Sequence, residues 1–263
     1  MENVIASKNN PIVKRAASLK DKKGRREHGA FLVEGEKMTA ECLDSKMDVL
    51  RVYFCENYVG KYEERILDAM KRRGMQEDRI VRLSESAFSC LSEEKTPQGV
   101  ICEASLPKNA IKEPTGDCLL LDGVSDPGNL GTIIRTANAA GYKEIYLVAC
   151  ADAYSPKCVR SSMSGVFFTT LYNADRETTL NVLKNTPILA ADMGGENVFT
   201  HQPPERFVLA IGNEANGLSE EVKNAAARTI AIPMRGEQES LNAGVAAAVC
   251  MYTLRRERFA AEK

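Results

Sequence analysis

Few histidines and no paired cysteines narrow the chemistry that this sequence can support. The 263 residues include only two histidines, His28 and His201, so zinc sites built on histidine and Ser-His triads are poorly supported. The eight cysteines contain no C-x-x-C pair, and Cys150 and Cys250 are among those inside apolar runs. We therefore expect buried, reduced thiols in a reducing compartment, and no metal.

Long hydrophobic runs and nucleotide fingerprints are also missing. No signal peptide or membrane-length apolar segment is evident, which predicts a soluble, cytoplasmic protein with no membrane partner. Neither G-x-G-x-x-G nor G-K-[ST] occurs, so a nucleotide-binding enzyme of those types is the least favoured reading. The net charge of -1 and a pI of about 6.2 give no global field that attracts nucleic acid.

The N-terminal segment departs from this neutral balance. Residues 1–30 hold eight basic side chains against three acidic ones. A basic arm of this kind could bind the phosphate backbone of a nucleic acid. The candidate contacts are Lys22, Lys23, Arg25 and Arg26. From charge alone, a solvated and partly helical N-terminus is an equally good interpretation.

The chain reads as two α/β parts joined by a linker. Residues 1–104 alternate short strands, expected at 31–35, 50–55, 78–84 and 99–104, with helical segments. Residues 105–117 break this periodicity with two prolines and a glycine, which indicates a linker. From 118 to 263 continuous apolar runs, including one at 166–173, alternate with helices and end in a long helix at 239–261. This pattern predicts a mostly parallel sheet covered by helices on both faces.

Ligands in such sheets lie beyond the carboxyl ends of the strands, and the first loop there is LDGVSDPGNLGTIIRTANAAG, residues 121–141. Asp126 is positioned to cap a helix that begins with proline. The buried stripe of this helix would be Leu130, Ile134 and Ala137. Arg135 falls on another face, one turn after Gly131, which would leave bare surface beside the guanidinium. A surface arginine in a capped helix is the alternative.

Two further loops follow predicted strands. In LAIGNEANGLSEE (209–221) a strand runs into Gly-Asn-Glu, and the glycines would let a ligand reach the main chain. Glu214 there could equally be a turn residue. In IPMRGEQESLNAGVAAAV (232–249) Ser240 is a good N-cap for the last helix, whereas Asn242 in its first turn has poor helix propensity and needs another explanation. A weaker signal is YSPKCVRSSMSG (154–165), where Ser155 and Pro156 form a capped helix start and Lys157 and Arg160 could hold phosphate.

Taken in order, PGNLGTIIRTANAAG, IGNEANGLS and IPMRGEQESLNAG strongly resemble the three motifs of the SpoU (TrmH-like) family of RNA ribose 2'-O-methyltransferases, within the SPOUT superfamily. The resemblance covers residues 118–263. Residues from SKNNPIVKR to FLVEGEK are similar to the substrate-binding domain of several ribosomal-RNA members, a fold like ribosomal L30e. Two departures are small: SLNAG stands where SLNVS is common, and Ala215 where glycine is common.

The resemblance implies a trefoil-knotted catalytic domain, one of the rare exceptions to the rule against threaded chains. It implies transfer of a methyl group from S-adenosylmethionine to a ribose 2'-hydroxyl, most readily of ribosomal RNA, by a homodimer with the active site near its interface. The main chain around Gly212, Ile232 and Leu241 would hold the adenosine part of the cofactor. The alternatives are a transfer-RNA ribose methyltransferase and a non-catalytic RNA-binding assembly factor of the same fold.

The resemblance also assigns roles. Arg135 would act either as the base or as an electrostatic clamp, and guanidinium is a poor base in proteins. Asn129 and Asn242 would fix loop geometry or the target ribose. Glu214 would orient Arg135 or tie the cofactor loop, and Ser240 would shape the third loop or touch substrate. The RNA backbone would be bound by Lys157, Arg160 and the basic arm.

Overall fold

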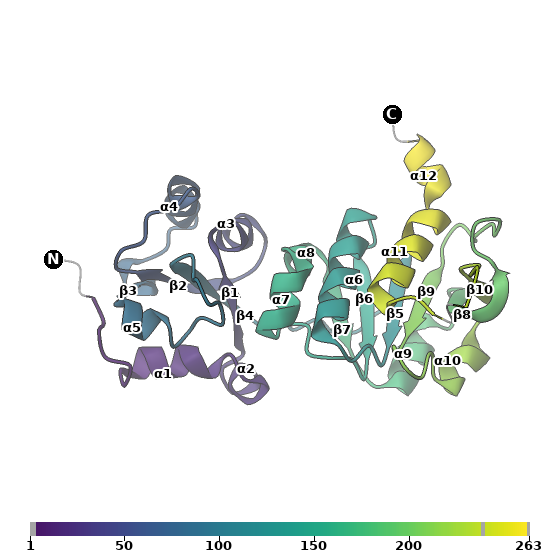
Figure 1. Ribbon diagram of the computed structural model, residues 1–263, viewed down its shortest axis with the longest axis horizontal. Coiled ribbons are helices and arrows are strands. Elements are labelled where there is room, and N and C mark those ends of the chain that lie inside the picture. The colour runs from purple at the N-terminus through teal and green to yellow at the C-terminus, as the bar shows by residue number, and fades with distance from the viewer. Residues whose placement is uncertain (1–3, 238–239, 262–263) are drawn as a thin grey trace. The chain divides into compact units, whose positions relative to one another are not determined.

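The computed structural model describes residues 4–237 and 240–261, and its chain divides into two compact units (Figure 1). The first unit contains the described residues up to Lys108 together with Tyr154–Phe167, and the second contains Asn109–Ala153 and the described residues from Phe168 onward. The segment 154–167 therefore belongs to the first unit, although in the sequence it lies in the middle of the predicted methyltransferase region. No described helix is both long and apolar enough to cross a membrane.

The first unit is a four-stranded mixed sheet with helices. Its strands follow the spatial order β1-β4-β2-β3, with β4 antiparallel to β1 and β2, and with β2 parallel to β3. The strands are β1 (Ala30–Glu34), β2 (Val49–Cys55), β3 (Ile80–Leu83) and β4 (Val100–Ser105). The helices before the second unit are α1 (Pro11–Ser18), α2 (Lys22–His28), α3 (Glu36–Asp44), α4 (Glu63–Arg72), the 3-10 helix η1 (Glu77–Arg79) and α5 (Glu85–Phe88). All four strands were predicted within a few residues.

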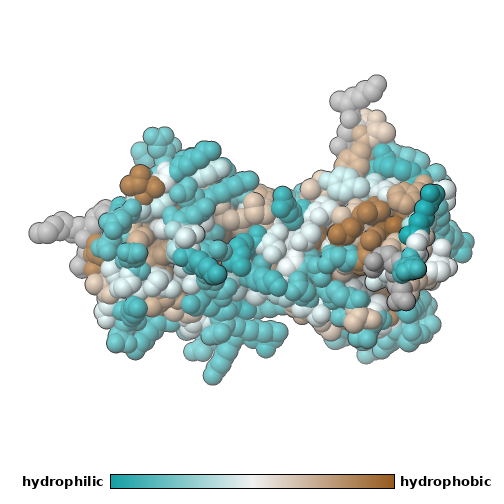
Figure 2. Space-filling model, viewed as in Figure 1, coloured by the Kyte–Doolittle hydropathy of each residue, from teal (hydrophilic) through white to brown (hydrophobic). Residues whose placement is uncertain are grey.

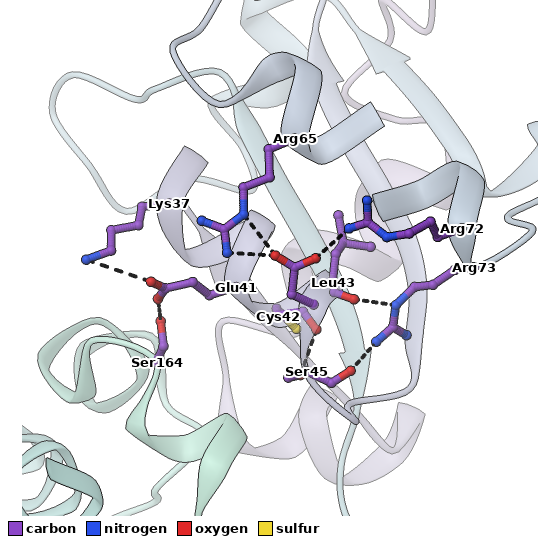
Figure 3. A network of polar contacts seen from close by, with 10 residues as sticks. Lys37, Glu41, Cys42, Leu43, Ser45, Arg65, Arg72, Arg73 and Ser164 are labelled. Atoms are coloured by element: carbon purple, nitrogen blue, oxygen red, sulfur yellow. Dashed lines mark hydrogen bonds and ion pairs between the residues drawn. The ribbon is translucent and has the colours of Figure 1, made fainter. Parts of the chain in front are cut away.

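Polar contacts join the ends of α3 and α4 (Figure 3). Asp44, the last residue of α3, accepts hydrogen bonds from Arg65 and Arg72 of α4. Arg73 donates to the main-chain carbonyls of Leu43, Ser45 and Met47. These contacts satisfy carbonyl groups that the end of a helix leaves without partners. They fix the two helices on one side of the small sheet.

The segment 154–167 contains α7 (Pro156–Ser162) and most of α8 (Gly165–Phe168). As predicted, the Ser155 side chain caps α7. Met163 and Ser164 both have positive φ angles, and the Ser164 hydroxyl donates to Glu41 of α3 (Figure 3). The strand predicted over 166–173 was wrong in its first half, because residues 165–168 form α8 and β7 begins at Thr170.

The second unit is built on a six-stranded sheet in which every adjacent pair is parallel, in the order β10-β8-β9-β5-β6-β7. The strands are β5 (Cys118–Asp122), β6 (Glu144–Val148), β7 (Thr170–Asn173), β8 (Ile188–Asn197), β9 (Val208–Gly212) and β10 (Arg228–Ala231). Its helices are α6 (Pro127–Ala139), α9 (Arg176–Leu183), α10 (Glu220–Ala225), α11 (Ala243–Leu254) and α12 (Arg256–Ala261). The predicted α/β class with a mostly parallel sheet is confirmed.

Successive side chains of each strand point to opposite faces of the sheet, and helices of this unit pack on both faces. Leu120, Tyr146 and Ala210 share one buried cluster with Leu183 of α9 and Val222 of α10. On the other side, α11 packs against α6 and β9. The predicted stripe of α6 (Leu130, Ile134 and Ala137) is buried together with Gly131 and Ile133. Arg135 is exposed, but the buried Gly131 does not provide the bare surface expected beside it.

The predicted linker is docked over its second half. Asn109 donates to the carbonyl of Leu171, and the Tyr146 hydroxyl donates to the carbonyl of Lys112. Thr115 donates through both its main chain and its hydroxyl to the buried carboxylate of Glu144. Residues 109–117 therefore belong structurally to the second unit.

The last helix begins later than predicted and is interrupted. Asn242, not Ser240, is the N-cap of α11, and its side-chain oxygen accepts from the main-chain N–H groups of Gly244 and Val245. The predicted start at residue 239 lies outside the described residues. The chain then breaks at Arg255, the C-cap of α11, before α12 begins.

Candidate functional site

Three loops meet at the carboxyl edge of the large sheet. β5 and β9 are neighbours, with Asp122 paired to Gly212 at their ends, so the loops that follow them lie side by side. A pocket of about 330 Å³ opens beside them. Gly212, Ile232 and Leu241, which the family resemblance implies as the cofactor-binding positions, all line this pocket. Glu214 and Ser240 line it as well.

The loop after β9 is closed on itself and leaves no room for a side chain at Gly212. Asn213 and Gly217 exchange two main-chain hydrogen bonds of 2.8 and 3.0 Å. A Cβ atom on Gly212 would stand 2.2 Å from the main-chain carbon of Gly217, which is well inside van der Waals contact. Gly217 itself has a φ of 68°, a left-handed value that favours glycine. Main chain therefore forms this wall of the pocket.

The helix α6 starts as the sequence indicates. The Asp126 carboxylate accepts a hydrogen bond of 2.8 Å from the main-chain N–H of Asn129, and Pro127 occupies the first turn. Arg135 projects from the exposed face of this helix. Among residues 4–237 and 240–261 its guanidinium has no hydrogen-bond or ion-pair partner. All of its donors are available to a ligand.

One chain of hydrogen bonds joins the three loops. The side-chain amide of Asn242 donates to the Asn129 side-chain oxygen at 2.9 Å, and the Asn129 amide donates to Glu214 at 2.9 Å. Because the Asn242 oxygen is occupied by the N–H groups of α11, only its nitrogen can face Asn129. The orientation of the Asn242 amide therefore fixes that of the Asn129 amide, whose nitrogen must face Glu214. Asn129, Glu214 and Asn242 are thus brought together across more than 110 positions of the sequence.

Glu214 is the acceptor at the end of this chain. It also accepts from the main-chain N–H and hydroxyl of Ser125, and from the N–H of Asp126. Burial alone would raise the pKa of Glu214, but the hydrogen bonds from Asn129 and from the main chain outweigh it and hold the pKa below its ordinary value. Within the described chain Glu214 binds the start of α6 and does not contact Arg135.

Sequence reasoning missed two supporting residues, Ser125 and Asn213. The Asn213 amide donates to the carbonyl of Gly123 at 2.8 Å, and its oxygen accepts from the main-chain N–H groups of Ala215 and Asn216. Asparagine directly after a strand is a common turn residue, which could have identified Asn213. Nothing in the sequence signals that Ser125 contacts a loop 89 positions away.

The predicted RNA contacts lie in the first unit, and they are not equivalent. Lys22, Lys23 and Arg26 are exposed on α2. Arg25 is 3% exposed and donates to the carbonyls of Leu19 and Lys20 at the end of α1. Its prediction as an RNA contact is corrected, because the side chain closes a helix end.

The remaining two candidates are on α7. Lys157 is exposed, whereas Arg160 forms an ion pair of 2.6 Å with Glu94. Both side chains of this pair are about half exposed, so water and salt weaken the attraction between them. Arg160 can therefore exchange its carboxylate partner for a phosphate.

No group of three or more His, Cys, Asp or Glu side chains in the described parts of the chain is arranged to hold a metal ion. The candidate site has instead an apolar and main-chain pocket, a fixed amide–carboxylate chain and an arginine that no described residue pairs with. That combination suits binding of an organic cofactor and charge stabilisation at an oxygen.

Two family models account for most of the chain. The SpoU rRNA Methylase family matches residues 118–252, and the MRM3-like substrate binding domain matches residues 10–102. The first match contains β5, β9 and all three motif loops. The predicted resemblance is thereby confirmed.

Relatives of known structure and function match nearly the whole chain. The 23S rRNA (guanosine(2553)-2'-O)-methyltransferase RlmP of Bacillus subtilis strain 168 is 33% identical, over 95% of this chain and 98% of its own. The AdoMet-bound rRNA methyltransferase of Sinorhizobium meliloti is 30% identical with a TM-score of 0.85, covering 97% of this chain and 98% of that one. The SpoU methyltransferase AviRb of Streptomyces viridochromogenes, in complex with AdoMet, is 26% identical with a TM-score of 0.83, covering 95% and 99%. The chain therefore belongs to the SpoU rRNA methylase family.

Proposed function

We propose that this protein transfers a methyl group from S-adenosylmethionine to a ribose 2'-hydroxyl of ribosomal RNA. The observation that carries the proposal is the hydrogen-bond chain Asn242–Asn129–Glu214, which ties the pocket loops to the helix that bears Arg135. A protein that only bound RNA would have no need to hold a cofactor-sized pocket and an unpaired arginine in one framework. The ribosomal-RNA relatives named above support the same reaction.

The pocket suits S-adenosylmethionine. Ile211, Ile230 and Ile232 give it apolar walls, on which a purine ring can pack, while the main chain at Gly212 can approach a ligand closely. When bound, the cofactor supplies an activated methyl group on sulfur. The main chain around Gly212, Ile232 and Leu241 would hold its adenosine part.

The protein must then place the hydroxyl in line and stabilise the charge that grows on its oxygen. Arg135 is suited to the second task, since its five N–H donors are unused by the described chain and a guanidinium binds phosphate and alkoxide oxygens well. We propose that it acts as an electrostatic clamp. Its action as the base that takes the hydroxyl proton is the rival hypothesis, which guanidinium chemistry disfavours. Ser240, on the pocket lining, is placed to shape the third loop or touch substrate.

We also propose a homodimer formed through α11. This helix is apolar on every side (AGVAAAVCMYTL), and Figure 2 shows hydrophobic side chains gathered over it. Val245 is 49% and Tyr252 45% exposed. Exposed apolar residues along a helix indicate an interface. Because α6 packs against α11, a partner seated here would lie near Arg135, and this supports a site completed by the second copy.

Finer features of the family belong to the same proposal. They are a trefoil knot in residues 118–263 and an L30e-like substrate-binding domain in residues 1–104. The two family matches lie inside these bounds. The predicted cytoplasmic location is supported by eight free cysteines, which suit a reducing compartment.

Methyl transfer in vitro tests the proposal. Purified protein is incubated with deuterium-labelled S-adenosylmethionine and either ribosomal RNA or transfer RNA, each from cells lacking the gene, and nucleosides are analysed by mass spectrometry. We expect a labelled 2'-O-methyl nucleoside from ribosomal RNA, formed about 10²–10³-fold more slowly with Arg135→Ala. Label found only in transfer RNA would show that the protein is a transfer-RNA ribose methyltransferase. RNA binding with no cofactor binding by calorimetry would favour an assembly factor and overturn the proposal.

A further inference from the structure

Both ends of the loop after β9 are held by the end of β5 and the turn that follows it. At the near end, the carbonyl of Gly123 accepts from the Asn213 side chain at 2.8 Å. At the far end, the Asp122 carboxylate accepts from the main-chain N–H of Ser219 at 2.8 Å. Ser219 is the N-cap residue of α10, so this contact fixes the point at which the loop becomes helix.

The second oxygen of Asp122 is bound by an arginine. Arg176, the first residue of α9, donates from Nη2 at 2.9 Å and from Nε at 3.3 Å. The Asp122 side chain is 2% exposed and that of Arg176 32%. A carboxylate this buried is costly unless its oxygens are fully bonded, and here a main-chain N–H and a guanidinium bond both of them. Burial alone would raise the pKa of Asp122, but Ser219 and Arg176 outweigh it and lower the pKa.

The loop held in this way is a wall of the cofactor pocket and has little freedom to adjust. Gly212, Asn213, Glu214, Ala215 and Gly217 all line the pocket. The main chain of Gly217 and Leu218 lies directly on Gly212, where even a methyl group would not fit. A displacement of Ser219 is therefore passed to the residues that face the cofactor.

We infer that Asp122 and Arg176 are positioning residues for S-adenosylmethionine, which set the shape of the pocket wall through the loop at 213–219 without touching the cofactor. This inference rests on the proposed function. Its consequence is selective: cofactor affinity depends on the Asp122–Arg176 pair, whereas affinity for RNA does not. If the ion pair were purely structural, its loss would lower the melting temperature and leave both affinities, measured well below that temperature, unchanged.

Asp122→Asn tests the inference while keeping the size of the side chain. We expect calorimetry at 20 °C to show S-adenosylmethionine binding weakened about tenfold, since small misplacements of binding groups have effects of this order or larger. The KM for the cofactor should rise in parallel, with the KM for RNA within twofold of the unsubstituted protein. Arg176→Lys, which keeps a cation in place, should restore most of the affinity lost in Arg176→Gln.

Glu221→Gln is the matched control. Glu221 lies 3.7 Å from Arg176 on its exposed side, so its removal changes the charge near the arginine without touching Asp122 or the loop, and cofactor affinity should stay the same. If Asp122→Asn does not fold, Arg176→Gln carries the test alone. Unchanged cofactor affinity in the folded variants would overturn the inference. Failure of the unsubstituted protein to bind S-adenosylmethionine would instead overturn the proposed function.

Discussion

Asn242 uses the two ends of one amide for different tasks. Its oxygen caps α11, and its nitrogen binds Asn129. Ser240, two residues earlier, is an equally good cap on local grounds, and the choice between them is made by a side chain on α6. Sequence reasoning found Asn242 unusual for its position but could not give this reason, because the partner is 113 positions away.

Two substitutions separate the tasks of Asn242. Asn242→Asp keeps the capping oxygen and loses the donor to Asn129, so we expect near-normal stability with strongly reduced methyl transfer. Asn242→Ala loses both and should also lower the free energy of unfolding by about 1–2 kcal/mol, the usual cost of a lost N-cap. Urea unfolding and single-turnover assays measure the two effects. Full activity in the aspartate variant would show that the amide chain has no catalytic importance.

Arg135 carries the second residue-scale prediction. Arg135→Ala should reduce the methyl-transfer rate about 10²–10³-fold, as the loss of a transition-state charge donor does, while S-adenosylmethionine affinity is kept because Arg135 is not among the pocket residues.

The pH–rate profile of Arg135→Lys distinguishes the two roles of this residue. An electrostatic clamp replaced by lysine leaves a weaker activity with the profile unchanged. If Arg135 were the base, its replacement by lysine would move the rise of the rate with pH to lower pH, because lysine loses its proton at lower pH than arginine. Near-normal activity of the lysine variant would contradict both roles.

At the scale of elements, apolar periodicity predicted nearly every strand, and cap chemistry predicted the starts of α6 and α7. Apolar periodicity failed at residues 165–168. The apolar, aromatic run there suits a strand, but the turn at Met163 and Ser164 directs the chain into α8. The order of the strands in the sheet could not be predicted from the sequence either. That β9 lies beside β5 decides which loops touch, and no local pattern encodes it.

The loop after β9 gives an element-scale prediction. Gly212→Ala places a methyl group 2.2 Å from the main chain of Gly217, so the loop must move. We expect a loss of more than about tenfold in S-adenosylmethionine affinity and a cost of about 1–3 kcal/mol in stability, as for other overpacked positions. Gly116→Ala is the control, because a Cβ there would meet nothing within 4 Å. Equal cofactor affinity in both variants would show that the main-chain wall is not used.

For the whole molecule, the two units divide the charge. The first unit carries more Lys and Arg than Asp and Glu, and the second has the opposite excess. This explains how a chain with a net charge of -1 can hold an RNA-binding part, since local rather than net charge attracts the phosphate backbone. The pI of the whole chain does not reveal this difference in charge between the units, and the basic arm accounts for only part of it.

Dimer formation is the whole-molecule prediction. Val245→Glu puts a charge on the exposed face of α11, so the dimer should dissociate and sediment as a monomer of about 28.9 kDa. Val59→Glu, at an exposed apolar position of the first unit, should stay dimeric. A dimer that survives Val245→Glu would place the interface elsewhere.

The central claim is that this chain methylates the ribose of ribosomal RNA through Arg135. The direct measurement is mass spectrometry of nucleosides from the ribosomal RNA of cells with the gene, without it, and with the Arg135→Ala form. The account predicts that one 2'-O-methyl nucleoside disappears on deletion, returns with the unsubstituted gene and stays absent with Arg135→Ala. An unchanged set of 2'-O-methyl nucleosides after deletion would contradict it.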